Sequence, residues 1–585
     1  MHVAIRVDAS VPIGTGHVIR CITLADGLKR MGATVSFICR ELEGHLIGVI
    51  RHQGFEVRIL PPGSGKNKGG LVHAHWLEED WETDARQTSE ILEECGVIDW
   101  LIVDHYALDS GWENLVHPYV GRVFVIDDIT DRNHECDVLL NQNLGYGRAH
   151  YRDRVPEACK LLLGPRFAVL RTGFRTERLR RRLIQRKSGA NRLLVFLGGA
   201  DPLDETSKVL DAVCMLEAEG VHTDVVVGVA NPRAEHIRAR CESMSGTSYH
   251  RGVDNMHELM ANAHLGVFSA GTATWERCAV GLPAIVVSIA ENQRLIAEQT
   301  ASAGASIYLG EAKNVSPKLL ADAVQNVLSL PETLERMSNA AYRLVDGAGL
   351  ARVLAAITGG PFRLSIVSDR DSWINDYLIN LADEWTAQGH QVAWLHDVNN
   401  LEEGDCAFYL GCGQLAGPGV LARNAHNLVV HESALPRGKG WAPLVWQILE
   451  GQNDIPVLLI EAVEKVDSGE IYSEDIIRFQ GHELCRELRA AQAEKTIELC
   501  KRFVERYPWI VTEGRPQSGE SSFYRRRTSE DSRLDLDTTL REQFNLLRTT
   551  DNERYPSFFD LNGVRYVLKI ERKDIDSTGE TEILR

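Results

Sequence analysis

Hydrophobic residues occur in short runs that alternate with amphipathic segments from the first residue onward. Residues 3–7 and 35–39 are apolar runs of strand length, and 20–31 carries apolar residues at helical period. The same rhythm returns at 100–104, 123–127 and 138–141. Strands that alternate with helices predict β-α-β units in a parallel sheet, and ligand-binding loops follow the carboxyl ends of such strands. The predicted fold class is therefore α/β.

A second series of this kind begins at 193–197 and continues through 225–229, 265–269 and 285–287. It ends at Gly359-Gly360-Pro361, because Gly and Pro together interrupt regular structure. A third α/β series starts at 362–368, and an alternating strand pattern at 564–570 marks a small β-containing tail. The predicted domains are 1–170, 191–358, 362–510 and 513–585, with the basic segment 171–190 as a connector.

Length and composition agree with several globular domains. The chain has 585 residues, whereas single cores stop growing at roughly 250 to 300 residues. Its 82 acidic and 64 basic residues give a net charge of −18, which argues against a nucleic-acid partner. No signal-peptide pattern or membrane-spanning apolar run is present in the sequence, so a cytoplasmic location and no membrane partner are expected. The 12 cysteines form no Cys-x-x-Cys pair, and no metal site is predicted.

The first candidate for chemistry is the loop Gly14-Thr15-Gly16-His17, which follows a strand and opens a helix. Backbone N–H groups at such a position can face a phosphate. A dinucleotide fingerprint is excluded because Ile19 occupies the place of its third glycine. A lone histidine is usually structural, but the place of His17 beside a glycine turn favours a catalytic role.

The second series contains three polar or small-residue segments in the order expected of a nucleotide-sugar binder. One is a bare glycine turn after a strand, the next is a small-residue turn that opens a helix, and the third is rich in amides. We expect the turns to hold a pyrophosphate and Glu276 to accept hydrogen bonds from ribose hydroxyls. The predicted substrate-binding residues are Gly14, Thr15, Gly16, Gly198, Gly199, Gly271, Thr272, Glu276, Asn292 and Gln293.

These motifs, together with 100–106, 126–128, 140–143, 163–165 and 274–283, resemble the UDP-sugar hydrolases of pseudaminic acid biosynthesis. The resemblance covers the first ~350 residues and implies the paired Rossmann-like domains of GT-B glycosyltransferases. It implies hydrolysis of UDP-2,4-diacetamido-2,4,6-trideoxy-β-L-altropyranose by inverting attack of water at the anomeric carbon, within the route to flagellin glycosylation. His17 falls on the family's catalytic histidine. An imidazole suits proton abstraction from water, and the glycine turns suit an anionic leaving group, so no metal is required.

The third series carries His431 after a strand, the loop Pro-Arg-Gly-Lys-Gly-Trp-Ala-Pro at 436–443, and Asp467. With 523–532 and 554–559, these features resemble sugar N-formyltransferases that use N10-formyltetrahydrofolate. The resemblance implies His431 and Asp467 as catalytic residues and a folate cofactor. The asparagine expected two residues before His431 is Val429, and loss of one oxyanion donor typically costs ~10² to 10³ in rate. Asn427 cannot replace it, because four residues along a strand span about 13 Å.

Three functional hypotheses follow. In the first, the C-terminal half formylates the 4-amine of a UDP-linked amino sugar and the N-terminal half removes UDP. The second makes the C-terminal half a non-catalytic recognition or assembly domain beside an active hydrolase. The third makes the N-terminal half a UDP-sugar-dependent glycosyltransferase. The expected partners are a small-molecule UDP-amino sugar, water and folate.

Overall fold

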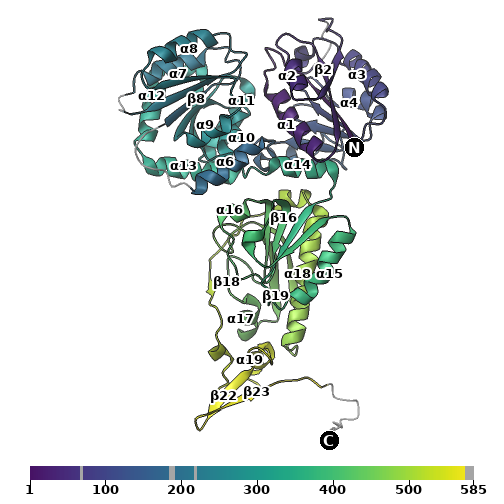
Figure 1. The fold of residues 1–585 in the computed structure, drawn as a ribbon, viewed down its shortest axis with the longest axis vertical. Coiled ribbons are helices and arrows are strands. Elements are labelled where there is room, and N and C mark those ends of the chain that lie inside the picture. The colour runs from purple at the N-terminus through teal and green to yellow at the C-terminus, as the bar shows by residue number, and fades with distance from the viewer. Residues whose placement is uncertain (66–69, 184–191, 217–219, 574–585) are drawn as a thin grey trace. The chain divides into compact units, whose positions relative to one another are not determined.

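The structure is a computed structural model that describes residues 1–65, 70–183, 192–216 and 220–573. The chain forms two compact units, Met1–Thr358 and Gly359–Arg585. The first unit contains two separate parallel sheets, each surrounded by helices (Figure 1). The second unit contains a six-stranded mixed sheet and a two-stranded hairpin near its C-terminus.

The first half of the first unit is a seven-stranded parallel sheet in the order β3-β2-β1-β4-β5-β6-β7. Its strand order reverses between β1 and β4, so the loops after these two strands diverge and leave a crevice at the carboxyl edge. The strands are β1 (His2–Val7), β2 (Thr34–Arg40), β3 (Glu56–Leu60), β4 (Trp100–Asp104), β5 (Val123–Ile126), β6 (Val138–Asn141) and β7 (Lys160–Leu163). The helices are α1 (Gly16–Arg30), α2 (Ile47–His52), α3 (Trp81–Cys95), α4 (Ser110–Val116) and α5 (Arg148–Tyr151).

The second half is a six-stranded parallel sheet in the order β10-β9-β8-β11-β12-β13, with the reversal between β8 and β11. Its strands are β8 (Arg192–Phe196), β9 (His222–Val227), β10 (Thr247–Arg251), β11 (Leu265–Ser269), β12 (Ala284–Ser288) and β13 (Ser306–Glu311). Its helices are α6 (Thr172–Leu183), α7 (Glu205–Val213), α8 (Ala234–Ser243), α9 (Met256–Asn262), α10 (Ala273–Ala279), α11 (Glu291–Ser302), α12 (Pro317–Leu328) and α13 (Pro331–Leu344), and α14 (Gly349–Thr358) follows.

Both faces of the second sheet are buried, which explains why its strands read as continuous apolar runs. Successive side chains of a strand point to opposite faces. Leu193 and Val195 accordingly belong to one hydrophobic core, whereas Leu194 belongs to a second core that contains Trp275. The cores fix the sheet between two helical layers and so fix the loops at its edge.

The two segments in which the chain crosses between the halves of the first unit contact each other. A Cβ atom at Gly349 would lie 2.3 Å from the carbonyl oxygen of Ala168, so only glycine fits there. Helix α14 then packs on α1, and a Cβ atom at Gly27 would lie 2.8 Å from Leu354 Cδ1. The last helix of the unit thus supports the helix that carries His17.

The second unit orders its main sheet β15-β14-β16-β17-β19-β20, with β19 and β20 antiparallel to their neighbours. The strands are β14 (Arg363–Val367), β15 (Gln391–Leu395), β16 (Gly404–Tyr409), β17 (Asn424–His431), β18 (Lys439–Gly440), β19 (Asp454–Glu461), β20 (Ile471–Arg478), β21 (Phe523–Tyr524), β22 (Ser557–Leu561) and β23 (Val564–Leu568). The helices are α15 (Asn375–Ala387), α16 (Pro418–Leu421), α17 (Pro443–Leu449), α18 (Cys485–Arg506) and α19 (Phe544–Thr549).

The predicted α/β class is confirmed: two Rossmann-like parallel sheets in the first unit precede a mixed α/β sheet in the second. Some predicted bounds are wrong. Helix α1 begins at Gly16, within the loop predicted to open a helix, whereas β9 begins at His222 rather than at residue 225. Asp224 in β9 is buried against Arg192 and His250, and an apolar pattern cannot reveal such a paired polar residue. Of the predicted connector 171–190, residues 172–183 form α6, and 184–190 lie outside the described residues.

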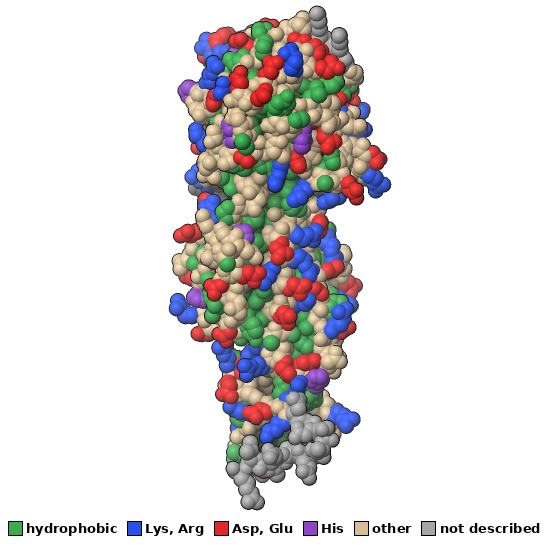
Figure 2. Space-filling model, turned by 90° about the vertical axis from the view of Figure 1, so that its right-hand side faces the viewer, with side chains coloured by type: hydrophobic (Ala, Val, Ile, Leu, Met, Phe, Trp, Pro, Cys, Tyr) green, Lys and Arg blue, Asp and Glu red, His purple; other side chains and the backbone are tan. Residues whose placement is uncertain are grey.

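Acidic and basic side chains are intermixed on the face drawn in Figure 2. Among the residues that the structure describes, no helix combines the length and the apolar character needed to cross a bilayer. In the same residues, no group of three or more His, Cys, Asp and Glu side chains is arranged to hold a metal ion.

Candidate active site

A cavity of about 690 Å³ lies between the two halves of the first unit, at the carboxyl edges of both sheets. His17 borders it from the first half. Most of the predicted binding residues border it too, namely Gly14, Thr15, Gly16, Gly198, Gly199, Gly271, Thr272, Asn292 and Gln293. Segments far apart in the sequence therefore meet in one place, as the order reversals of both sheets predict.

The glycine turns of the two halves approach each other closely. A Cβ atom at Gly16 would lie 3.3 Å from Thr272 Oγ1, and one at Gly199 would lie 3.1 Å from Thr15 Oγ1. Gly14 and Gly198 also have positive φ angles, of 80° and 102°, which glycine adopts without strain. Backbone shape therefore favours glycine at Gly14 and Gly198, whereas a side chain at Gly16 or Gly199 would press on a threonine of the other half.

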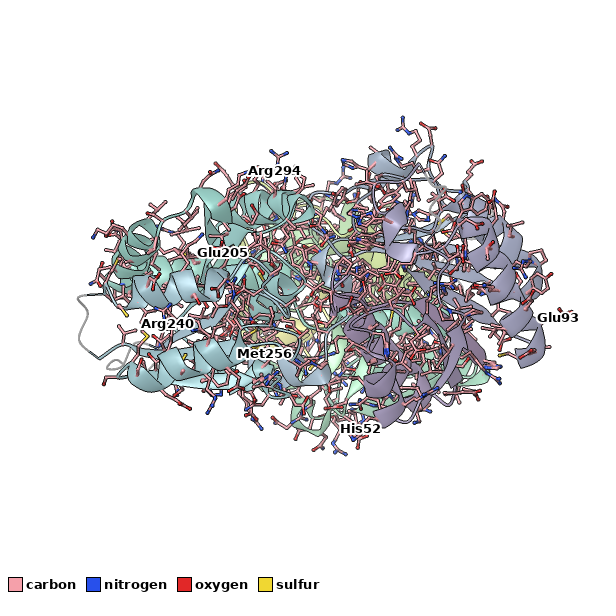
Figure 3. All side chains as sticks on the ribbon, turned by 90° about the horizontal axis from the view of Figure 1, so that it is seen from above. His52, Glu93, Glu205, Arg240, Met256 and Arg294 are labelled. Atoms are coloured by element: carbon pink, nitrogen blue, oxygen red, sulfur yellow. The ribbon has the colours of Figure 1, made fainter. Side chains whose placement is uncertain are left out.

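Two long helices begin at the cavity. Helix α1 starts at Gly16 and α11 starts at Glu291, and neither has a side-chain N-cap. The first N–H groups of a helix have no partner within the helix, and its dipole favours an anion at that end. Asn292 and Gln293 lie in the first turn of α11, whereas Arg294, labelled in Figure 3, pairs with Glu291 at the surface. The cavity is therefore suited to an anionic group.

His17 is held by the carboxylate that ends β4. His17 Nδ1 lies 2.6 Å from Asp104 Oδ1. Because the carboxylate only accepts, Nδ1 carries the proton and donates it, which leaves Nε2 as the basic nitrogen. Within the described residues Nε2 has no hydrogen-bond partner, and the ring borders the cavity. An aspartate that orients a histidine in this way also stabilises the imidazolium formed when the ring takes a proton.

Arg20 keeps Asp104 ionised. Its Nε and Nη2 atoms each donate to one Asp104 oxygen at 2.6 Å, and its Nη1 forms an ion pair with Asp128 Oδ2 at 2.7 Å. Burial by itself would raise the pKa of the Asp104 carboxyl, but the charges of Arg20 and His17 and their hydrogen bonds outweigh it and hold the pKa well below its usual range. Asp104 is therefore the anionic partner of His17 at neutral pH.

An aromatic wall completes the first half of the cavity. The rings of Trp76 and Tyr106 stack with centroids 5.2 Å apart, and the His17 ring meets Tyr106 edge-on at 4.7 Å. Burial and the nearby Asp128 carboxylate raise the pKa of Tyr106 well above its usual value, so its hydroxyl stays protonated and donates to Asp128. Such a wall offers apolar contact beside the polar turns.

Glu276 is set apart from the other predicted binding residues. It lies in α10 and does not border the cavity. Its Oε1 is 3.8 Å from Arg171 Nη2. Burial raises the pKa of Glu276, and the Arg171 charge lowers it only in part. A role for Glu276 at a ribose remains a prediction.

The catalytic and binding residues predicted from the sequence did not include four residues that the structure places around His17: Arg20, Asp104, Asp128 and Asn143. The last three lie in the segments 100–106, 126–128 and 140–143 that carry the resemblance, but no role was assigned to them. Asp104, Asp128 and Asn143 come at or just after the ends of β4, β5 and β6. A polar residue at a strand end of a parallel sheet was the available signal. Arg20 had no such signal, because a basic residue one turn into a helix is ordinarily solvated.

In the second unit, His431 and Asp467 come together. His431 ends β17, and its Nδ1 lies 3.6 Å from Asp467 Oδ1. Asp467 also accepts a hydrogen bond from the Gly440 backbone N–H at 2.9 Å. His431 Nε2 donates to the Gly438 carbonyl at 2.9 Å. Both ring nitrogens are thus directed at groups of the protein.

The donor set for formyl transfer is incomplete. Val429 occupies the position of the expected asparagine and packs among apolar residues. Asn427 is buried, where its amide donates to the Leu421 carbonyl and accepts from the Tyr409 hydroxyl. The residues present fit the proton-transfer part of a formyl-folate site but do not supply a side-chain oxyanion donor at residue 429.

The fold and the cavity define the class of the first unit: a glycosyltransferase-like α/β unit of GT-B type. Residues 193–350 match the glycosyltransferase family 28 C-terminal domain. The spore coat polysaccharide biosynthesis protein SpsG of Bacillus subtilis is 24% identical over 362 residues, which cover 61% of this chain and 98% of that protein.

The UDP-2,4-diacetamido-2,4,6-trideoxy-beta-L-altropyranose hydrolase of Campylobacter jejuni is 30% identical over 177 residues. The match covers 30% of this chain and 54% of that enzyme, so the chain spans about half of the relative's length. Among solved structures, MurG of Acinetobacter baumannii has a TM-score of 0.45 at 14% identity, covering 61% of this chain and 99% of that one. A 4-N formyltransferase of Francisella tularensis has a TM-score of 0.30 at 18% identity, covering 37% of this chain and all of that one (100%).

Proposed function

We propose that the first unit hydrolyses a UDP-linked 2,4-diamino-2,4,6-trideoxy sugar to the free sugar and UDP, as a step of pseudaminic acid biosynthesis. The observation that carries the proposal is the pairing of His17 with Asp104. His17 Nδ1 lies 2.6 Å from Asp104 Oδ1, which leaves His17 Nε2 as the basic nitrogen of a ring that borders the cavity. The family 28 match in the second half and the hydrolase relative support a nucleotide-sugar substrate.

In this reaction His17 Nε2 takes a proton from a water molecule as the water oxygen attacks the anomeric carbon. Attack on the side opposite the leaving group inverts that carbon. Asp104 stabilises the imidazolium, and it stays ionised because Arg20 donates to both of its oxygens. The bond from the anomeric carbon to the phosphate oxygen breaks, and UDP leaves with the electron pair.

The leaving diphosphate needs stabilisation of its negative charge rather than protonation. The turns at 198–199 and 271–272 and the start of α11 present backbone N–H groups at the cavity. Groups fixed in place before the reaction stabilise a developing charge without reorganising. The aromatic pair Trp76 and Tyr106 lies on the His17 side, where it would contact the apolar C6 methyl of a 6-deoxy sugar.

His17→Ala is expected to lower UDP release by about 10³-fold or more, because the general base is lost. The assay follows UDP production from a UDP-diamino sugar with no added sugar acceptor. His52→Ala is the matched control, since His52 is exposed at the end of α2 (Figure 3). UDP release only in the presence of a sugar acceptor would make the unit a glycosyltransferase and end the hydrolase proposal.

Formyl transfer is a second candidate, assigned to the second unit. The approach of His431 to Asp467 favours it. The proposed reaction is formylation of the free 4-amine of the UDP-linked sugar from N10-formyltetrahydrofolate, before UDP is removed. His431 would accept the amine proton after releasing the Gly438 carbonyl. Without a donor at residue 429 the rate would be ~10² to 10³ below that of a complete site.

Incubation of the protein with a UDP-4-amino sugar and formyl-folate tests this activity by mass spectrometry. The expected product gains one formyl group, and His431→Ala is expected to abolish the gain because it removes the proton acceptor. His17→Ala serves as the control that retains formylation. If neither the wild-type protein nor His17→Ala transfers a formyl group, the second unit is a non-catalytic domain.

A further inference from the structure

A chain of buried and partly buried hydrogen bonds and ion pairs runs from the second half of the first unit to His17. Trp275 Nε1 donates to Asn143 Oδ1 at 3.1 Å across the boundary between the halves. Asn143 Nδ2 donates to Asp128 Oδ1 at 3.1 Å and to its carbonyl at 3.2 Å. Asp128 pairs with Arg20, and Arg20 binds the Asp104 carboxylate that holds His17.

Trp275 and Asp128 together fix the position of the Asn143 amide. An indole N–H can only donate, so the carbonyl oxygen of Asn143 must face Trp275 and its NH₂ group must face Asp128. The Asp128 carboxylate and carbonyl only accept, so they keep the NH₂ group on their side. Without the indole N–H, the amide oxygen would lose the donor that holds it, and Asn143 would shift relative to Asp128 and so displace Asp128 from Arg20.

Trp275 itself cannot touch a substrate. Its side chain is fully buried in the core between the second sheet and its helices, and it does not border the cavity. It follows the Gly271–Thr272 turn directly, because α10 begins at Ala273. Trp275 is therefore connected along the chain to the turn that would hold the diphosphate. Through its hydrogen bond to Asn143 it is also connected to His17 on the other side of the cleft.

We propose that Trp275 is a positioning residue by which the second half of the unit sets the geometry of the general base His17 in the first half. The proposal rests on the hydrolase function stated above and deepens it. The effect passes from Trp275 to His17 through the side chains of Asn143, Asp128, Arg20 and Asp104. The site is then competent only when the turn at 271–272 and the His17 loop are in register, as their close approach also requires.

Trp275→Phe removes the N–H and keeps most of the ring. The loss of one buried hydrogen bond is expected to lower kcat for UDP release roughly tenfold, with KM for the UDP-sugar changed less than about twofold. Trp394→Phe is the matched control. Its Nε1 donates to Ser368 Oγ at 2.9 Å in the second unit, outside the proposed hydrolytic machinery, so UDP release is expected to stay at the wild-type rate.

A second measurement does not depend on activity. The Nδ1–H proton of His17, hydrogen-bonded to a carboxylate at 2.6 Å, is expected to give a downfield proton resonance, assigned by its absence in His17→Ala. Trp275→Phe is expected to shift or broaden that resonance, and Trp394→Phe to leave it unchanged. If Trp275→Phe does not fold, Asn143→Asp tests the same link by opposing Asp128 with a second negative charge.

An unchanged kcat together with an unchanged resonance in Trp275→Phe overturns the proposal. A raised KM with unchanged kcat also overturns it, because that result assigns Trp275 to nucleotide binding alone. Absence of UDP release in the wild-type protein would instead refute the hydrolase function, and the resonance would still decide whether Trp275 positions His17.

Discussion

Asp104→Asn is expected to lower kcat for UDP release by about 10³-fold, with a smaller change in KM. Four donors are aimed at the two oxygens of Asp104, namely His17 Nδ1, two nitrogens of Arg20 and the Cys21 thiol. An amide has one acceptor oxygen, so its NH₂ group must face one of these donors. Facing His17, it would reverse the imidazole tautomer and turn Nε2 from an acceptor into a donor. Steady-state measurement of UDP release checks the prediction.

The matched control for this substitution lies at the other end of the same strand. Asp99 immediately precedes β4, is exposed, and accepts from the His2 backbone N–H. Asp99→Asn is expected to keep the wild-type rate. A wild-type rate in Asp104→Asn would show that proton abstraction does not depend on the His17–Asp104 pair. Circular dichroism on both variants separates a catalytic loss from a folding defect.

Asp84→Asn is expected to destabilise the first unit by about 3 to 5 kcal/mol at neutral pH, since it leaves a buried charge uncompensated. Asp84 is buried in α3 and binds two buried arginines, Arg6 at 2.8 Å and Arg40 at 2.6 Å. It also accepts from the Trp112 indole at 2.9 Å. Unfolding of the full chain in denaturant measures the loss, as the change in the free energy of unfolding of the first unit.

A surface pair supplies the comparison for Asp84. Asp211 and Arg240 are 2.6 Å apart on α7 and α8, and the Asp211 side chain is half exposed (Figure 3 labels Arg240). Asp211→Asn is expected to cost less than about 1 kcal/mol, because water screens exposed pairs. Equal losses of unfolding free energy in Asp84→Asn and Asp211→Asn would contradict the prediction, because it depends on the difference in burial between the two carboxylates.

The Asp84 carboxylate also makes the stability of the first unit depend on pH. Burial alone would raise the pKa of Asp84, but the charges and hydrogen bonds of Arg6 and Arg40 lower it to about 2. An unfolded aspartate has a pKa near 3.9. The stabilisation is therefore fully present above pH ~4 and is lost as the pH falls from there toward 2. The stability of Asp84→Asn should fall less steeply than that of the wild type over this window.

The sequence pattern predicted the strands of the first unit better than the residues that act with His17. Apolar runs such as 100–104 and 265–269 coincide with β4 and β11, because a strand covered on both faces must be apolar throughout. The partner of His17 could not be inferred in this way. Asp104 lies 87 residues away along the chain, and only the sheet order β1-β4 makes the two adjacent.

In the second unit, the sequence indicated the two polar side chains but not their surroundings. The structure places Asp467 Oδ1 3.6 Å from His431 Nδ1, and the catalytic role of the two residues stays a prediction. The hydrogen bond from His431 Nε2 to the Gly438 carbonyl depends on the path of the 436–443 loop, which adopts positive φ at Gly438 and Gly440. Such a path follows from tertiary contacts, here the pairing of β18 with β21, and not from local propensity.

Helix α14 determines where this chain can be divided. It leaves the second Rossmann-like half and packs on α1, with Leu354 against Gly27 on the helix that begins at the His17 loop. A gene fragment that stopped at the end of α13 would contain every residue of the cleft and still lack the support beneath the base. The junction with the second unit falls at Thr358, where α14 ends. A chain divided at that point would therefore keep the first unit whole, with the support beneath the His17 loop in place.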